Sequence, residues 1–232
     1  MKRGKNYKVT LEELREKEMY SLDEALPLLI NSSKVKFDAS CEVHLNLNVN
    51  PKQADQTVRY TVNMPNGTGK DLKVVAFVPD DKAKACLDAG ALKAGETDLV
   101  EEVSKGFTGF DIAVASPDMM KSLGKVAKVL GQKCLMPNPK AGTVTPDVEK
   151  TIKEIKKGKI EVKNDKLGNV HNIFGKVSFG EEKLMENLKA YLKSITDNKP
   201  TGVKGTFIKS IHLCTSMGPS IKLDPNQVMA NL

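Results

Sequence analysis

Three kinds of residue in this chain could do chemistry: histidines, cysteines and a glycine-rich turn that precedes a lysine. The histidines are His44, His171 and His212; the first and last fall on faces of predicted strands, and His171 lies near a predicted turn. We interpret each as a polar surface residue rather than a catalytic base. The acidic residues lie scattered along predicted helix surfaces, without the paired spacing that acid–base catalysis uses. The sequence therefore predicts no catalytic residue.

The cysteines are widely separated and include no C-x-x-C pair. They are Cys41, Cys86, Cys134 and Cys214. Structural zinc sites use closely spaced ligands, and only the three histidines could supplement these cysteines, so no metal site is predicted. Cys41 and Cys214 lie in predicted strands and are expected to be buried thiols. Free thiols are typical of a reducing cytoplasm, which is the compartment we expect.

The segment Gly67–Lys70 has part of the pattern of a phosphate-binding loop. The full motif also needs a Gly five residues before the last Gly and a Ser or Thr after the Lys, where this chain has Met64 and Asp71. We therefore interpret the segment as a flexible linker. A nucleotide-binding enzyme would instead need a glycine-rich loop after the apolar run 74–78. The residues that follow, Pro79-Asp80-Asp81, are acidic and glycine-free, which disfavours this alternative.

Other segments could bind a partner without doing chemistry. Thr215–Ser220 combines hydroxyls, a Met and a Gly-Pro turn, which favours a docking surface. Phe37 beside Lys36 could cover a base or ribose while the Lys meets phosphate, or could close the edge of the core. Gly175–Phe179 joins a strand to a helix whose N-terminus could hold a phosphate, or could form an ordinary cap. For the last two segments the residues alone favour the structural interpretation.

The elements that must position these residues are of two styles. Alternating hydrophobicity predicts half-buried strands at 41–49 and 58–64, whereas continuous apolar runs at 74–78 and 112–115 predict strands buried on both faces. Helices are predicted after the capping boxes Thr10-x-x-Glu13 and Ser21-x-x-Glu24 and over 82–89, 119–130, 146–156 and 184–195, with strands at 160–162, 170–173 and 206–215. Pro27 is expected to kink the second helix.

This order predicts an α/β protein with two domains, the first of them discontinuous. Residues 1–67 plus 159–232 would form an α+β outer domain, and residues 68–158 an inserted Rossmann-like βαβ domain. The two chain crossings would form a hinge. The outer domain carries a net charge of +5 out of the +7 of the whole chain.

Composition limits the class of protein. With 40% hydrophobic and 28% charged residues the chain of 232 residues is expected to be soluble and globular. The net charge of +7 favours a polyanionic partner without identifying one. No apolar run approaches the roughly 18–20 residues that span a bilayer. Residues 1–8 are basic but precede no apolar core, so we interpret them as a basic arm rather than a signal peptide.

Several of these segments, in this order, resemble the large-subunit ribosomal protein L1 family, the mobile side-stalk protein near the tRNA exit site, in its bacterial or organellar type. The resemblance rests on Lys36-Phe37-Asp38 before Glu42-Val43-His44, on Asn164-Asp165-Lys166, on Gly175–Phe179, on Thr215-Ser216-Met217-Gly218, and above all on Leu135–Val144. The chain departs from the family at Gln132-Lys133-Cys134, where the family has Pro-Arg-Gly, and at Ser216, where it has Thr.

The resemblance implies a structural RNA-binding protein that is not an enzyme and has no cofactor, metal or catalytic residue. It reverses the structural interpretations of Phe37 and of Gly175–Phe179. The family's RNA-binding positions match Lys36, Phe37, Ser40, Asp165, Gly175, Lys176, Ser178, Ser210, Thr215, Ser216, Met217, Gly218 and Pro219. The stretch Pro137–Val144 is expected to be a structural element that faces the other domain or RNA.

The resemblance also implies partners. They are the side-stalk region of large-subunit rRNA, deacylated tRNA leaving the exit site, and the mRNA of the protein's own operon, whose translation it would repress. The protein is expected to be a monomer when free, to have no membrane partner, and to reside in the cytoplasm on the ribosome.

Overall fold

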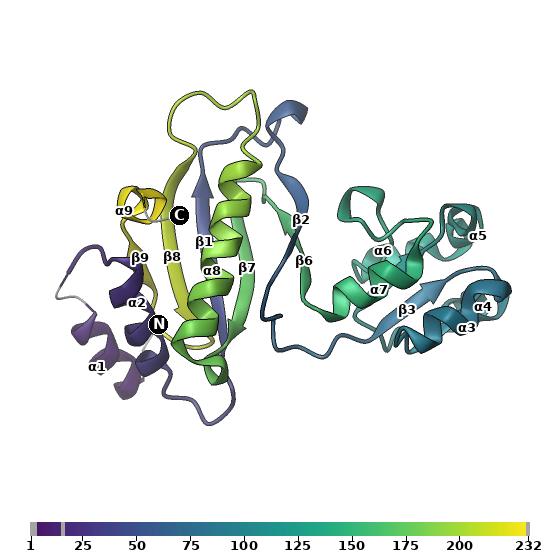
Figure 1. Ribbon diagram of the computed structural model, residues 1–232, viewed down its shortest axis with the longest axis horizontal. Coiled ribbons are helices and arrows are strands. Elements are labelled where there is room, and N and C mark those ends of the chain that lie inside the picture. Colours follow the sequence, from purple (N-terminus) through teal and green to yellow (C-terminus); the bar gives the residue numbers. More distant parts are fainter. Residues whose placement is uncertain (1–3, 15–16, 231–232) are drawn as a thin grey trace. The chain divides into compact units, whose positions relative to one another are not determined.

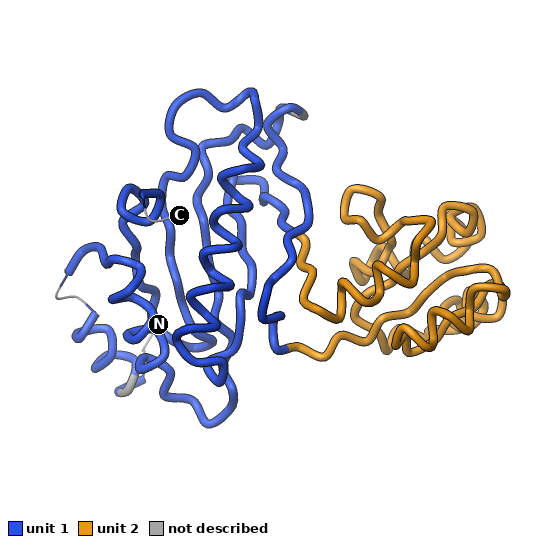
Figure 2. Tube along the Cα trace, viewed as in Figure 1, with its two compact units in different colours: residues 1–69, 162–232 blue, residues 70–161 orange. Residues whose placement is uncertain are grey.

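The computed structural model describes residues 4–14 and 17–230, and these form two compact units. The outer unit consists of Met1–Gly69 and Val162–Leu232, and the inserted unit is Lys70–Glu161 (Figure 2). Helices and strands alternate along the chain, and both parallel and antiparallel sheets occur, which confirms the predicted α/β class. In the described ranges we find no helix with the length and apolar character needed to cross a membrane.

The outer unit is built on a four-stranded antiparallel sheet with the order β7-β1-β8-β9 (Figure 1). These strands are β1 (Ser40–Leu47), β7 (Asn169–Lys176), β8 (Ile208–Thr215) and β9 (Ile221–Leu223). Every second residue of β1, beginning at Cys41, is buried, as the alternation predicted. The helices α2 (Leu22–Ser32) and α8 (Gly180–Asp197) pack on this apolar face. The opposite face carries polar, partly exposed side chains.

Of the two capping boxes that the sequence predicted, one is present at the start of a helix and the other is not. The capping box at Ser21 is confirmed: the Glu24 backbone N–H donates to Ser21 Oγ, and the Ser21 N–H donates to the Glu24 carboxylate. The box at Thr10 is wrong, because α1 (Lys5–Glu13) begins after Gly4 and therefore holds Thr10 in its interior. Pro27 lies inside α2, and the helix continues past it to Ser32.

The rest of the outer unit consists of short elements. Strand β2 (Arg59–Asn63) pairs with β6 (Lys159–Lys163), of which only the last two residues belong to the outer unit, in a two-stranded sheet. Short 3-10 turns occur at Ala54–Gln56 and Val177–Phe179. Helix α9 (Pro225–Ala230) packs on β8. Strand β9 and helix α9 were not predicted, because segments of three and six residues are too short for a periodic pattern to stand out.

The inserted unit contains a parallel sheet with the order β4-β3-β5. Its elements are β3 (Val74–Phe77), α3 (Asp80–Asp88), β4 (Lys93–Gly95), α4 (Thr97–Ser104), β5 (Ile112–Ala115), α5 (Met120–Leu123), α6 (Ala127–Gln132) and α7 (Val148–Lys156). Alternate residues of β3 belong to separate apolar clusters, so the strand is buried on both faces as predicted.

Two predictions in the inserted unit are wrong or incomplete. The helix expected over 119–130 is interrupted, because a 3-10 turn at Gly124–Val126 separates α5 from α6, and another 3-10 turn at Pro117–Met119 precedes α5. Gly124 lies at that break, and glycine favours the helical conformation less than most residues do. Strand β4 and helix α4 were not predicted; the three residues of β4 are only partly buried and give no hydrophobic signal.

Candidate nucleic-acid interface

The loop after β8 holds the most exposed apolar side chain of the site. Met217 is 80% exposed and has a φ of 68°, in the left-handed region. This backbone conformation costs about 1–2 kcal/mol in a residue other than glycine. Two hydrogen bonds tie the loop to the start of β1: the Ser216 N–H donates to the Ser40 carbonyl over 3.0 Å, and the Ser40 N–H donates to Ser216 Oγ over 3.2 Å. The neighbouring strand therefore holds Met217 outward in a strained conformation.

Gly218 closes this loop, and the position accepts no side chain. Its N–H donates to the Thr215 carbonyl over 2.8 Å, and a Cβ built on it would lie 2.3 Å from Thr215 Oγ1. Thr215 is only 2% exposed, and its hydroxyl has no hydrogen-bond partner in the described part of the chain. Unpaired buried hydroxyls are rare in folded proteins. The loop thus combines backbone strain with an unpaired polar group, which is common at functional sites.

The segment before β1 meets the end of β7 beside this loop. Phe37 is 58% exposed, so its interpretation as a residue that closes the core edge is wrong. Asp38 accepts hydrogen bonds from the Ser178 N–H over 3.1 Å and from the Ser178 hydroxyl over 2.8 Å. Lys176 Nζ donates to Ser40 Oγ over 2.8 Å and to the Asp38 carbonyl over 3.4 Å. Asp38 was absent from the predicted site, although it holds two of the predicted residues in place.

Three of the predicted contact residues are buried and support the surface from beneath. They are Gly175, Thr215 and Pro219. A Cβ on Gly175 would lie 2.5 Å from Leu184 Cδ2, so α8 packs directly against the strand backbone there. Their role in the structure is therefore close packing under the exposed residues.

The structure does not bring all the predicted residues together. Ser40 pairs with Lys176 at one end of β1, whereas Asn46 pairs with Asn169 and Ser210 near the other end. Six residues of strand separate the two groups by about 20 Å. Asp165 and Ser210 belong to the second group, and the other predicted residues lie around Ser40 or in the segments next to it.

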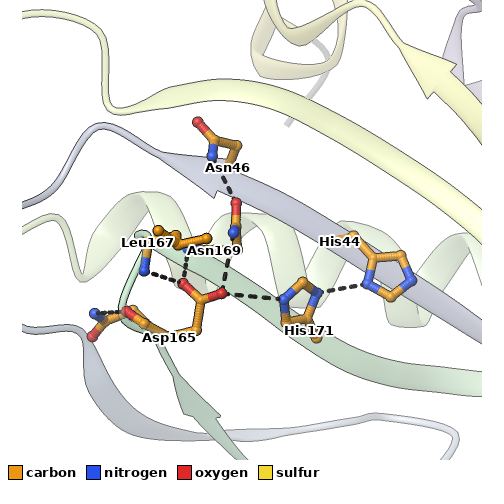
Figure 3. A network of polar contacts seen from close by, with 7 residues as sticks. His44, Asn46, Asp165, Leu167, Asn169 and His171 are labelled. Atoms are coloured by element: carbon orange, nitrogen blue, oxygen red, sulfur yellow. Dashed lines mark hydrogen bonds and ion pairs between the residues drawn. The ribbon is translucent and has the colours of Figure 1, made fainter. Parts of the chain in front are cut away.

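Asp165 organises the turn that leads into β7 (Figure 3). Its Oδ1 accepts from the backbone N–H groups of Leu167 over 2.8 Å and Asn169 over 2.7 Å. The Asn169 amide donates to Asp165 Oδ2 over 3.1 Å. The hydrogen bond from the Asn169 backbone is the main reason that the pKa of Asp165 is lowered. Asp165 is therefore an ionised acceptor inside the turn.

A row of histidines crosses the sheet between the two groups. His44 in β1 pairs with His171 in β7 and with His212 in β8. His171 lies in β7, three residues after the turn that ends at Gly168, which agrees with its predicted place near a turn. Burial lowers the pKa of His44, as does the neighbouring His171, and burial together with Lys222 lowers the pKa of His212. Both effects favour neutral rings at physiological pH.

His44 also faces a thiol. Its Nε2 lies 3.1 Å from Cys214 Sγ. Burial, followed by the Glu42 carboxylate, raises the pKa of Cys214 to about 11. A catalytic cysteine has a lowered pKa, so this pair does not have the properties of a nucleophile and its base. Cys214 is only half-buried, whereas Cys41 is fully buried as predicted.

The first helix lines a hollow beside the Met217 loop. The hollow, of about 130 Å³, is lined by Tyr7, Thr10, Ser32, Lys34, Val35, Ser216, Met217, Gly218 and Pro219. The N-terminal residues 1–3, predicted to belong to a basic arm, lie outside the described residues. The part of the arm that is described belongs to α1 and adjoins the loop.

In the inserted unit, the stretch Pro137–Val144 is held by its own hydrogen bonds. The Asn138 N–H donates to Thr143 Oγ1 over 2.8 Å, and the Asn138 side chain accepts from the Lys140 N–H over 2.8 Å. Val144 bridges in parallel to Ala115 of β5. Nearby, Cys134, which stands where the family has Gly, has a φ of 57°. A residue with a side chain therefore adopts the left-handed conformation at this position.

Among residues 4–14 and 17–230, neither unit shows the arrangement of an enzyme active site, and the outer unit presents the features of a docking protein. Comparison with known proteins agrees. The chain belongs to the ribosomal protein L1p/L10e family, whose model matches residues 29–219. It is accordingly a structural, non-enzymatic constituent of the large ribosomal subunit.

Its relatives match over nearly their whole length. The large ribosomal subunit protein uL1 of Thermobifida fusca is 48% identical over 226 residues, which cover 97% of this chain and 96% of that protein. The protein of the same name from Onion yellows phytoplasma is 48% identical over 225 residues, covering 97% and 98%. That of Thermosipho africanus is 49% identical over 207 residues, covering 89% of each chain.

Proposed function

We propose that the outer unit binds the side-stalk region of large-subunit rRNA through the surface around Ser40. The observation that carries this proposal is the exposure of Phe37 and Met217 beside Lys36 and Lys176, on a frame of hydrogen bonds that fixes them. Exposed apolar side chains can pack on bases and riboses, while lysines meet phosphates. The net charge of +5 on the corresponding segments of the sequence adds long-range attraction.

The two groups of residues suggest a grip at two points. In this proposal the group around Ser40 contacts one part of the RNA, and Asp165 with Ser210 contacts another part about 20 Å away along β1. Only a folded RNA that presents both parts at this separation would use the whole surface. Hydroxyls and backbone groups would recognise 2′-OH groups and shape rather than base sequence.

Three finer roles belong to the same proposal. The inserted unit, acting as a separate domain, would move with the stalk and help deacylated tRNA leave the exit site. The RNA-binding surface would also bind the mRNA of the protein's own operon and repress its translation. The protein would act on this mRNA as a free monomer, and because one surface serves both RNAs, rRNA and mRNA should compete for it.

The test is a filter-binding titration of the side-stalk rRNA fragment at several salt concentrations, with an unrelated structured RNA as competitor. We expect tight binding that survives the competitor and falls only moderately with salt. Binding that collapses with salt and does not distinguish the two RNAs would mean that the charge of +7 explains it, and the proposal would be wrong.

Two lysines provide a matched pair of variants for this titration. Lys36→Ala, in the proposed surface, should weaken binding and reduce the salt slope by about one unit, as expected for the loss of one phosphate contact. Lys125→Ala removes another exposed lysine, this one from the inserted unit, and should change neither the affinity nor the salt slope. Equal losses from both variants would indicate diffuse electrostatic attraction instead of a defined site.

A further inference from the structure

The polar face of the outer sheet gathers three metal-binding side chains from two adjacent strands. Glu42 and His44 come from β1 and Cys214 from β8, which pairs with it. His44 Nε2 lies 3.1 Å from Cys214 Sγ and 3.6 Å from Glu42 Oε2. The ligand atoms of all three lie within 4.8 Å of one another.

These separations fit one tetrahedral ion. With bonds of about 2.0–2.3 Å to nitrogen, oxygen and sulfur, two ligands of a tetrahedral zinc ion lie about 3.4–3.6 Å apart. The separations from His44 Nε2 are close to that value, so small side-chain movements suffice. One Cys, one His and one carboxylate leave a fourth position for water, as in zinc sites that keep an open coordination position.

The neighbours of His44, which Figure 3 shows, determine which of its two ring nitrogens is free to bind an ion. His171 Nε2 lies 3.7 Å from Asp165 Oδ2, and the two Nδ1 atoms of His171 and His44 lie 2.8 Å apart. In neutral rings, the proton of His171 therefore belongs on Nε2, beside the carboxylate. Its Nδ1 then accepts from the Nδ1–H of His44, which leaves the lone pair of His44 Nε2 facing the thiol and Glu42.

We propose that Glu42, His44 and Cys214 bind a zinc ion on this face of the sheet, with Asp165 and His171 as residues that position His44. A metal-bound histidine usually donates its other ring N–H to such a partner, which fixes the tautomer. A coordinated thiol is deprotonated. The thiolate and the carboxylate together would balance the two positive charges of the ion.

Without an ion, the same arrangement leaves one contact unfavourable. If His44 Nε2 accepts a hydrogen bond from the Cys214 thiol, this nitrogen carries no proton of its own. The Glu42 carboxylate then faces a ring nitrogen that cannot donate a hydrogen bond to it. A cation at this point meets all three groups at once. The metal site shares Asp165 with the proposed RNA surface, but metal binding is measured on the protein alone, so the failure of one proposal can be distinguished from the failure of the other.

The test is a titration of the reduced full-length protein with Co²⁺, which substitutes for zinc and absorbs visibly when four-coordinate. We expect one Co²⁺ ion to bind per chain and to give a thiolate-to-cobalt charge-transfer band in the near ultraviolet. Addition of Zn²⁺ should abolish this band and the visible absorption of the bound cobalt. The absence of a saturable charge-transfer band in the wild-type protein would overturn the proposal.

Variants identify the ligands. Cys214→Ser should abolish the charge-transfer band, and Glu42→Gln, which changes a partly exposed carboxylate without changing its size, should weaken affinity at least tenfold. Cys134→Ser removes the exposed thiol of the inserted unit and should leave the band unchanged. A band that survives Cys214→Ser, or that disappears with Cys134→Ser, would place the metal elsewhere and overturn the proposal.

A further variant tests the positioning residue. His171→Gln should retain the band, because all three ligands remain, but should weaken affinity by about 10- to 100-fold, as for other partners of metal-bound histidines. His212→Gln changes the other histidine of the row, which is not in the ligand group, and should have little effect. If His171→Gln and His212→Gln change the metal affinity equally, the assignment of His171 as the residue that positions His44 is wrong.

Discussion

Met217 offers the sharpest test of the proposed RNA surface. Full burial of a Met side chain contributes about 1.5–3 kcal/mol. Because Met217 is 80% exposed, covering it with RNA contributes about 1.2–2.4 kcal/mol. Met217→Ala should therefore weaken binding of the side-stalk rRNA fragment by roughly 7- to 50-fold, since 1.4 kcal/mol is tenfold.

A second substitution at the same position distinguishes the effect of losing the side chain from the effect of the strained backbone. Met217→Gly removes the same side chain but relieves a left-handed conformation that costs about 1–2 kcal/mol. Glycine also stabilises the unfolded chain by about 0.5–1 kcal/mol. The Gly variant should thus be more stable than the Ala variant by about 0.5–1 kcal/mol while binding RNA equally poorly.

The assay is filter binding at one fixed salt concentration, with stability measured in parallel by urea unfolding. Leu87→Ala is the control, because it shortens an exposed apolar side chain of the inserted unit and should leave binding unchanged. Binding by Met217→Ala within twofold of the wild type would refute the reasoning, and so would equal losses in Met217→Ala and the control.

Three more predictions concern backbone conformation and thiols. Gly218→Ala should lower the free energy of unfolding by about 1–3 kcal/mol in urea, because its Cβ would press on buried Thr215, whereas Gly131→Ala, with open space around it, should not. Cys134→Gly should raise the midpoint of thermal unfolding, because it relieves a left-handed backbone cost of about 1–2 kcal/mol, which exceeds the roughly 0.5–1 kcal/mol by which glycine stabilises the unfolded chain; a lower midpoint would contradict this. Alkylation of the native protein near pH 8, followed by peptide mass analysis, should modify exposed Cys134 first. Cys41 should stay unmodified, since burial raises its pKa to about 12, and its early modification would show that the sheet opens.

The sequence predicted what depends on local pattern. The alternation at Cys41–Val49 was enough for strand β1, and the Ser-x-x-Glu spacing at Ser21 was enough for the start of α2. The same capping spacing failed at Thr10, because a helix had already begun upstream. A local motif indicates a helix start only where no earlier residue has started the helix.

What could not be predicted depends on register between distant strands. The strand register pairs His44 with His171 and His212, which aligns three histidines across the sheet. The rule that zinc ligands lie close together in the sequence could not predict this alignment. The separation of Ser210 from Ser216 also follows from strand direction. Asp38 was overlooked for a related reason, because its partner Ser178 lies far along the chain.

The central position of β1 has a consequence for how the protein is made. Both neighbours of β1 are synthesised long after it, and β8 ends at Thr215. At about 5–20 residues per second, roughly 10–30 s pass between the emergence of β1 and that of β8. The parallel sheet of the inserted unit is complete by Ala115 and can fold meanwhile. The loop that carries Met217 follows β8 directly, so a nascent chain gains its proposed RNA-binding surface only after β8 has emerged.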